Sequence, residues 1–403
     1  MIRALAAAAT GITNRLVMQR IHHLSFALRF SRLLAAFSES VRRTAARINT
    51  IHVACLTREG TLFHHCHTAT WDNKARVSRI FPASRISTFG PAFSRRPQYH
   101  FSRIQHQYPK LTLAGLMRSL DVWESIASAS RIAESTPWNT TIDAIEPEYV
   151  VWVLQHTRTW SLLLQRAELI QRAVERMFPS KRVLCCDIGW RGTMQDNLQT
   201  ICNDVDWHGV YLGLDDPLFP SDDRSTKYSA GIGIQPLALI DRLVLKLSPG
   251  LEMLCNCAGG SSLRWIMDAG GNPVCLKKVH RLEDVIWHVF TSKIQRDVLS
   301  RIGTEYCSIR SLSDDKIGTM IAALHRSLLL FPSLAASRAF GALHHDESFG
   351  SDRILNPGQA SLFGSPRSVW RSLYAHVWPQ SWLKTCGLGI LLPVYNHLRR
   401  NKP

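Results

Sequence analysis

The sequence has no long apolar run and no disulfide-type arrangement of its cysteines. No stretch approaches the roughly 20 apolar residues that a membrane-spanning helix needs. Cys185 and Cys186 are adjacent in an apolar segment, and Cys255 and Cys257 are separated by one residue, which is too close for a zinc hook. These spacings predict reduced, buried thiols and a cytoplasmic protein.

Acidic residues are scarce in the first 110 residues. This part holds 15 Arg and 2 Lys against Glu39, Glu59 and Asp72, and it carries most of the net charge of +17. Such a field attracts phosphates, nucleic acid or an anionic membrane surface. The arginines are scattered among apolar residues, without an RNA-binding fingerprint or a Lys/Arg-dense tail. This pattern favours an anionic small molecule or peripheral contact with a membrane over nucleic acid.

Several common catalytic motifs are also missing. The chain contains no G-x-S-x-G, no P-loop and no G-x-G-x-x-G. It therefore lacks the sequence signatures of α/β-hydrolases, P-loop nucleotide hydrolases and dinucleotide-binding proteins.

Short apolar runs alternate with helical patterns through the first half of the chain. This order predicts an α/β fold of Rossmann-like type, with an open, mostly parallel sheet flanked by helices. Residues 86–110, rich in Pro, Gly, Ser and Arg, predict an irregular basic loop. A β-hairpin is predicted within an α-rich C-terminal extension, over Trp265–Leu276. Strands are predicted at Ile51–Thr57, Val77–Ala83, Arg182–Ile188 and Trp207–Leu214, and helices at residues 24–48, 61–68, 111–120, 122–133, 150–178, 193–202, 283–302 and 314–330.

Changes in composition divide the chain into four parts. Residues 1–23 form a basic N-terminal segment. Residues 24–215 form the α/β ligand-binding domain, with a helical insertion over residues 111–178. Residues 216–345 form an α+β extension, and residues 346–403 form a tail containing Pro and Trp.

Polar residues with an arginine follow three of the predicted strands. In an open parallel sheet, ligands bind beyond the carboxyl ends of the strands. Three basic strand ends therefore predict one site for an anionic ligand. Its candidate residues are Arg58, Glu59, Gly60, Ser84, Arg85, Asp187, Gly189, Trp190, Arg191, Gly192 and Thr193.

The candidate residues suit phosphate binding. An arginine matches phosphate or carboxylate geometry with two hydrogen bonds. Gly189 and Gly192 let the backbone approach a ligand, and Thr193 is placed as the N-cap or a first-turn residue of a helix whose free amides favour an anion. Trp190 either stacks on a ring of the ligand or fills the loop.

Asp187 is the candidate catalytic residue. It suits a divalent cation such as Mg²⁺, a sugar hydroxyl, or an ion pair with Arg58 or Arg85, and the sequence does not choose among these roles. A simpler alternative is that Asp187 only caps its loop and pairs with an arginine.

Two other clusters are weaker candidates. The run His64–His67 resembles a set of metal ligands, but consecutive residues of a helix point in different directions. The loop containing His344, His345 and Asp346 also resembles a set of metal ligands.

Glu252 is a separate weak candidate. With a Gly-rich segment after it, this residue fits a substrate loop or a helix that ends at a glycine.

The chain resembles a family of bacterial haloacid-dehalogenase-like predicted hydrolases associated with surface-polysaccharide (rhamnan) synthesis. The resemblance covers residues 25–385 and follows the part of those proteins beyond their hydrolase domain. Its most specific motif is D-I-G-W-x-G-T at residues 187–193. The segments that carry it are LTREGTLF (56–63), ASRIS (83–87), CDIGWRGTMQDNL (186–198), GVYLGL (209–214), EMLCNCAGGSS (252–262) and FPSLAASRAFGAL (331–343).

The chain departs from this family at the hydrolase motif. Haloacid-dehalogenase hydrolases need a strand ending in D-x-D-x-[TV], where the first Asp is the nucleophile and the second the acid/base. Asp187-Ile188-Gly189 lacks the second Asp, and nothing near the start of the chain has that form. The phosphatase activity implied by the family is therefore not carried over. Either the chain is the companion module alone or its gene start is truncated.

A second similarity is to type I phosphoribosyltransferases. Those enzymes bind pyrophosphate with a loop after the first strand and a ribose phosphate with a T-G-x-T loop after an acidic strand. Arg58-Glu59-Gly60 and Asp187–Thr193 occur in that order, although the acidic pair is replaced by Cys186-Asp187 and the loop spacing differs.

These observations predict a protein that binds a phosphosugar or a nucleotide-sugar in bacterial cell-surface polysaccharide synthesis, either as an enzyme or as a degenerate one. The alternative is a non-catalytic module that docks on a glycosyltransferase complex or on the membrane through the basic region 1–110.

Overall fold

The structure is a computed structural model. It describes residues 26–71, 76–127, 136–216, 225–233, 237–247, 249–279, 281–334, 336–337, 345–347, 353–355, 373 and 378–400. The predicted N-terminal segment 1–23 and His344 lie outside these residues, as does half of the predicted tail.

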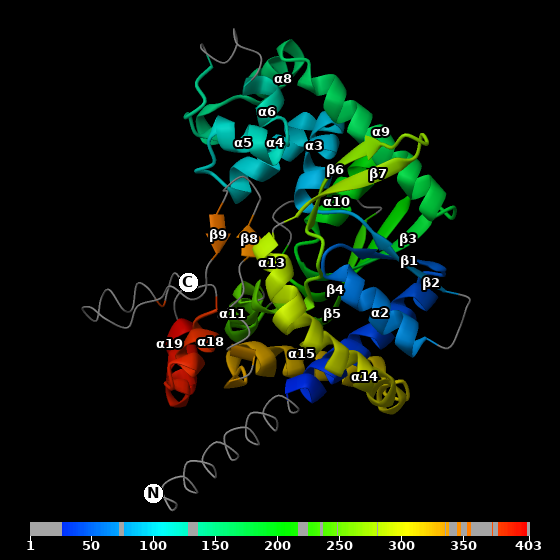
Figure 1. Ribbon diagram of the computed structural model, residues 1–403, viewed down its shortest axis with the longest axis vertical. Coiled ribbons are helices and arrows are strands. Elements are labelled where there is room, and N and C mark those ends of the chain that lie inside the picture. Colours follow the sequence, from blue (N-terminus) through cyan, green and yellow to red (C-terminus); the bar gives the residue numbers. More distant parts are fainter. Residues whose placement is uncertain are drawn as a thin grey trace, which may run out of the picture.

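A five-stranded parallel sheet forms the centre of the protein (Figure 1). Its order is β2-β1-β3-β4-β5, and Cys55 of β1 lies in register with Ile80 on one side and Cys186 on the other. The predicted α/β class and the four predicted strands are confirmed. The strands are β1 (His52–Leu56), β2 (Val77–Phe81), β3 (Arg182–Trp190), β4 (Asp206–Leu214) and β5 (Thr226–Ile232).

Alternate residues of the central strands enter two separate cores, because successive side chains of a strand point to opposite faces. Val53 and Cys55 of β1 belong to one core, whereas Ala54 and Leu56 belong to the other. Helices cover both faces, which explains why β1 and the middle of β3 are apolar, whereas the edge strands β2 and β5 contain Arg79 and Lys227.

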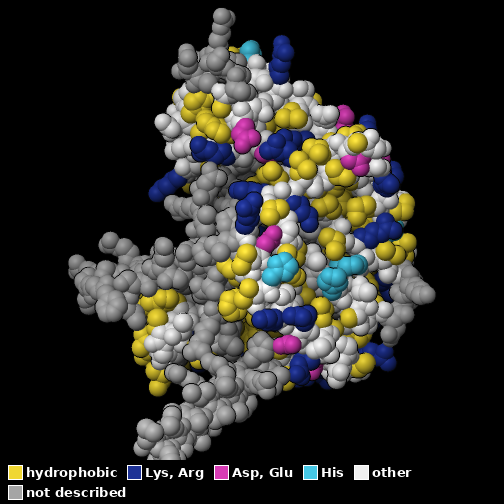
Figure 2. All heavy atoms as spheres, viewed as in Figure 1, with side chains coloured by type: hydrophobic (Ala, Val, Ile, Leu, Met, Phe, Trp, Pro, Cys, Tyr) yellow, Lys and Arg dark blue, Asp and Glu magenta, His cyan; other side chains and the backbone are white. Residues whose placement is uncertain are grey.

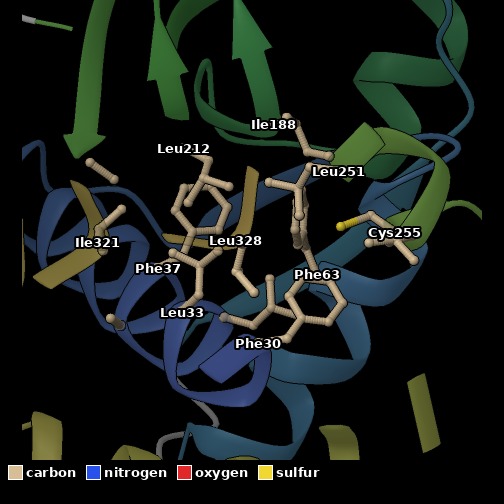
Figure 3. Close-up of a cluster of buried hydrophobic side chains, with 14 of the residues drawn as sticks. Phe30, Leu33, Phe37, Phe63, Ile188, Leu212, Leu251, Cys255, Ile321 and Leu328 are labelled. Carbon is tan, nitrogen blue, oxygen red and sulfur yellow. The ribbon is translucent and has the colours of Figure 1, made fainter. Parts of the chain in front are cut away.

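The larger core lies beneath a helix of residues 26–47, as predicted from its apolar stripe. Phe30, Leu33 and Phe37 of that helix point toward the sheet, where Ile188 and Leu212 face them (Figure 3). The other helices on this face are α2 (Gly60–Thr70), α11 (Leu239–Lys246), α12 (Pro249–Cys255), α14 (Ser292–Ile309) and α15 (Asp314–Leu330).

The opposite face is covered by three helices and a hairpin. The predicted hairpin is confirmed, and Trp265 from its first strand enters the core against Phe81. These elements are α3 (Arg85–Arg95), α9 (Thr159–Met177), α10 (Thr193–Ile201), β6 (Ser261–Met267) and β7 (Pro273–Lys278).

A group of short helices packs beside α3 and α9 around a third apolar cluster. It contains α4 (Pro97–Gln107), α5 (Leu113–Ser119), α6 (Trp123–Ala127), the 3₁₀ turn η1 (Ile142–Ala144) and α8 (Pro147–His156). The single helix predicted over residues 150–178 is divided between α8 and α9, because Arg158 adopts a left-handed conformation with φ of 59°.

The prediction of an irregular loop at residues 86–110 is wrong, because α3 and α4 occupy it. Ser84 and Ser87 form a reciprocal capping box at the start of α3. Phe89 and Phe93 then lie one turn apart and bury their rings in the third cluster. Burial of this apolar face outweighs the low helix propensity of Gly and Pro in the segment.

The sheet continues past residue 215, where the predicted α/β domain ended. Strand β5 pairs with β4, and α15 packs on β5 so closely that a Cβ on Gly231 would lie 2.4 Å from Ile321 Cγ2. The sheet therefore draws on both of the predicted domains. The remaining elements, all of which come after α12 in the chain, are α13 (Arg281–Ile286), the π-helical turn η2 (Trp287–Thr291), β8 (His345–Glu347), β9 (Arg353–Leu355), α18 (Pro379–Thr385), the 3₁₀ turn η4 (Gly389–Leu391) and α19 (Leu392–Arg400).

All ten cysteines are free thiols, and six of them are buried. Among the residues that the structure describes, no helix combines the length and the apolar character needed to cross a bilayer.

Substitution of Gly60, the first residue of α2, tests how closely this helix packs on the end of β1. A Cβ on Gly60 would lie 2.5 Å from the carbonyl carbon of Cys55, so Gly60→Ala is expected to lower the free energy of unfolding by about 1–3 kcal/mol. Gly303, in the middle of α14, has no atom within 4 Å of the same position. Gly303→Ala should instead raise stability by about 0.5–1 kcal/mol. Urea denaturation measures both, and equal effects of the two variants would contradict this packing.

Candidate functional site

A cavity of about 360 Å³ opens at the carboxyl ends of the strands. Its walls come from the segments that follow β1, β2, β3 and β4, together with α11, α12 and the start of β6. The structure brings all the predicted site residues except Gly60 to this cavity. They are Arg58, Glu59, Ser84, Arg85, Asp187, Gly189, Trp190, Arg191, Gly192 and Thr193.

The loop between β3 and α10 depends on its two glycines. Gly189 has φ of 129°, and a Cβ there would lie 1.8 Å from the carbonyl oxygen of Gly213 on β4. Gly192 has φ of 64°, and a Cβ there would lie 2.7 Å from Tyr211 Oη. Only glycine adopts these angles without strain and leaves room for the neighbouring strand.

Gly192 is the N-cap of α10, so the helix begins at the cavity wall without a side-chain cap. The first-turn amides of a helix have no partner within the helix and favour an anion. Thr193 and Met194 of this first turn line the cavity. The start of α10 is therefore arranged to receive a negatively charged group.

Lys227 of β5 stabilises this loop through two hydrogen bonds. Its Nζ donates to the carbonyl oxygen of Arg191 over 3.0 Å and to Asp196 Oδ2 over 2.9 Å. The Lys227 side chain is almost fully buried, and so is that of Asp196 in the first turn of α10. The lysine balances the negative charge of Asp196, which otherwise would oppose an anion at the helix start.

Asp187 lies at the floor of the cavity and is 7% exposed. Its Oδ1 accepts a hydrogen bond from the backbone amide of Ile188 over 2.8 Å. Burial raises the pKa of this carboxyl well above its usual range, and the nearby charges of Glu59 and Glu252 raise it further. Asp187 therefore keeps its proton to a higher pH than an exposed aspartate does, and a protonated carboxyl can donate a hydrogen bond.

Glu252 of α12 is a second acid at the cavity, and it is half-buried. Its Oε1 accepts a hydrogen bond from Trp190 Nε1, and its pKa is raised by burial and by Glu59. The Trp190 ring also packs against the larger core. Trp190 thus fixes the position of Glu252 while lining the cavity.

The three arginines at the strand ends have different surroundings. Arg58 is buried, and its Nη1 donates to Glu283 Oε2 of α13 over 3.0 Å. Arg191 is half-buried and lies 3.5 Å from Asp215 Oδ2 at the end of β4. Arg85 opens α3, and its charge lowers the pKa of both acids, Asp187 and Glu252.

Ser84 has a structural part at this site. Its Oγ caps α3 by accepting from the amide of Ser87 and donates to the carbonyl oxygen of Ser262 over 2.6 Å. Thr57 Oγ1 lies 2.8 Å from Ser262 Oγ. Through these contacts, the beginning of β6 connects the segments that follow β1 and β2 along one wall of the cavity.

Other cavity residues were not among the predicted ones. Asp215 follows β4 directly, so the strand-end rule that selected Asp187 would have found it too. Lys246 comes from α11, which follows the unpredicted strand β5 and therefore had no strand end to mark it. Glu252 of α12 was only a weaker candidate in the sequence, and the structure places it in the cavity wall. The remaining unpredicted lining residues are Thr57, Ile86, Gln107, Met194, Leu245, Pro249 and Ser261.

The histidines of α2 have structural partners. His64 Nδ1 and His67 Nδ1 both lie 3.2 Å from Ser78 Oγ on β2, and His67 stacks on Trp71. Across the part of the chain that the structure describes, no three His, Cys, Asp or Glu side chains are grouped so as to hold a metal ion.

Comparison of the chain with protein-family models and with curated proteins finds no match. The resemblance to the haloacid-dehalogenase-like family therefore stays a prediction, and the arguments about function depend on the geometry of the cavity.

The raised pKa of Asp187 predicts how stability changes with pH. Because the folded-state pKa lies above the unfolded value, the stabilising contribution of this group is present at low pH and is lost as the pH rises through the folded pKa. Asp187→Asn removes the ionisation. It is expected to stabilise the protein by about 0.5–2 kcal/mol at pH 8, and by less at pH 5.

Thermal unfolding across this pH range measures the effect. Asp315→Asn, which replaces an exposed acid in the first turn of α15, is the control and should change stability by less than about 0.5 kcal/mol. A loss of stability in Asp187→Asn at every pH would show that the ionised carboxylate stabilises the fold.

Proposed function

We propose that the cavity binds a phosphorylated sugar. The observation that supports this proposal is that the start of α10, the strand-end arginines and the acids Asp187 and Glu252 all line one cavity. The helix start and the arginines suit a phosphate, and the two acids suit the hydroxyls of a sugar.

We place the phosphate of this ligand at the start of α10. The amides of the first turn, from Thr193 onward, donate to its oxygens, and the Arg191 guanidinium supplies a charge-assisted hydrogen bond. The pairing of Lys227 with Asp196 keeps this end of the cavity favourable for an anion.

We place the sugar of this ligand next to Asp187 and Glu252. A carboxyl that keeps its proton can donate a hydrogen bond to a sugar oxygen and accept one from a hydroxyl. The raised pKa of Asp187 provides this state, and it also suits a general acid that gives its proton to an oxygen in a reaction. Asp187 is thus the residue to which we assign both sugar recognition and any proton transfer.

The size of the cavity favours the smaller of the two expected ligand classes. Ligand pockets commonly enclose about 300–1,000 Å³. At about 360 Å³ the cavity is near the lower limit. A sugar monophosphate fits this volume better than a nucleotide-sugar. A role in bacterial surface-polysaccharide synthesis in the cytoplasm follows only from the family resemblance and belongs to the same proposal.

Ligand binding can be tested with glucose 1-phosphate and ribose 5-phosphate by calorimetry and thermal shift. Arg191→Ala is expected to weaken binding by about tenfold or more, because it removes a charge-assisted hydrogen bond of about 1.5–3 kcal/mol. Arg182→Ala is a matched control. Arg182 lies at the other end of the same strand and is also 3.5 Å from an aspartate, Asp206.

Three comparisons decide the outcome of this test. Free glucose should bind far more weakly than its phosphate, and UDP-glucose more weakly than the monophosphate. Arg182→Ala should bind like the unmodified protein. The proposal is abandoned if neither sugar phosphate binds, or if both arginine variants bind equally well.

A separate prediction concerns Lys227, which contacts the loop from the side away from the ligand. Lys227→Met keeps the apolar stem and removes the ammonium group that holds Arg191 and Asp196. It is expected to weaken sugar-phosphate binding by about tenfold, since Asp196 then loses its counter-charge near the phosphate. Restored affinity in the double variant Lys227→Met/Asp196→Asn would distinguish this charge effect from a loose loop.

A further inference from the structure

Helix α19 is fixed to the body of the protein by its inner face. Leu392 and Tyr395 are buried against α18, and Asn396 is buried as well. Asn396 Nδ2 donates to the carbonyl oxygen of Leu330 at the end of α15, while Gln380 Nε2 of α18 donates to Asn396 Oδ1. These buried hydrogen bonds hold the helix in one orientation, so its outer face is presented rigidly.

The outer face of α19 and η4 is apolar and exposed. Ile390 is 86% exposed, Val394 59%, Leu398 47% and Leu391 46%. Residues 390, 394 and 398 are spaced four apart, which places them on one side of a helix. We call these four residues the outer stripe. Hydrophobic side chains gather over α18 and α19 at the lower left of the space-filling view (Figure 2).

The stretch of sequence that carries the outer stripe has basic residues and no acidic ones. The sequence from residue 353 to residue 403 contains no Asp or Glu. Lys384 lies beside Gly389 at the start of η4, and Arg399 and Arg400 end α19. An apolar face with cationic residues near both ends matches the interface of an anionic bilayer, where acyl chains lie beneath negative headgroups.

We propose that the outer stripe of η4 and α19 docks on an anionic lipid bilayer. The helix would lie in the plane of the interface, with Ile390 and Val394 among the acyl chains and Lys384 near the headgroups. Stable attachment to a membrane needs two contributions, and here apolar burial and electrostatic attraction come from the same element.

The structure favours this surface over the two other candidates for such contact. Several arginines of the basic region 1–110 are already occupied, since Arg42 and Arg43 bind Glu39, and Arg43 and Arg47 bind Asp314. A second copy of the chain is disfavoured by area. A stable dimer buries about 800 Å² per partner, far more than four side chains of this size can supply.

Co-sedimentation of the full chain with vesicles tests the proposal. Vesicles of phosphatidylcholine with phosphatidylglycerol should bind the protein, whereas phosphatidylcholine alone should bind it weakly. Binding should fall in about 1 M salt, where charges are screened beyond about 3 Å. The double variant Ile390→Ser/Val394→Ser should lower partitioning about tenfold or more.

The matched control is Val285→Ser/Val289→Ser, which removes two valines that are 57% and 47% exposed on α13 and η2. This control should partition like the unmodified protein. Both double variants should also keep its unfolding temperature, because all four side chains are exposed. The proposal is overturned if the unmodified protein does not bind anionic vesicles or if the two double variants partition equally. It is likewise overturned if ultracentrifugation shows a dimer that Ile390→Ser/Val394→Ser dissociates.

Discussion

The parallel direction of all five strands is the constraint on which the cavity depends. Helices cover both faces of the sheet, so the side chains in the middle of the central strands are apolar and pack into one core or the other. The first positions free of this requirement are those at the carboxyl ends of the strands and just beyond them. Since parallel strands all end at one edge, Arg58, Arg85 and Asp187 meet there although they are far apart in the sequence.

Charge balance at that edge follows from the same geometry. Several arginines at one edge would repel each other, and the fold supplies acids from other elements to offset them. Glu283 of α13 pairs with Arg58, and Asp215, which directly follows β4, lies against Arg191. Asp187 remains a buried acid beside Glu59 and Glu252, an arrangement that opposes its ionisation. A group that costs stability and lines a cavity is characteristic of sites shaped for ligands.

Much of the fold could be predicted from local patterns. The runs around residues 51–57, 182–188 and 207–214 are short and apolar, as buried parallel strands are, and the polar residues after them identified most of the cavity. Strand β5 was not predicted, because its Ser, Ala and Gly allow α15 to approach closely and leave little apolar signal. Helices α3 and α4 were missed since their stability comes from tertiary burial of Phe89, Phe93 and Phe101.

Pairings across the fold were beyond such patterns. Nothing local shows that Arg58 meets Glu283, that Lys227 holds the loop before α10, or that Trp190 donates to Glu252. Each of these contacts joins residues more than 30 positions apart. They depend on how whole helices sit on the sheet, which no short window of sequence contains.

The division between strand interiors and strand ends also bears on how this protein can evolve. Arg85, Arg191 and Thr193 belong to neither apolar core, so mutation can exchange them while the sheet and its helices persist. Gly189 and Gly192 are under the opposite pressure, because any side chain there collides with β4. Descendants of this chain should therefore diverge in the side chains that line the cavity faster than in backbone path, and they should retain both glycines.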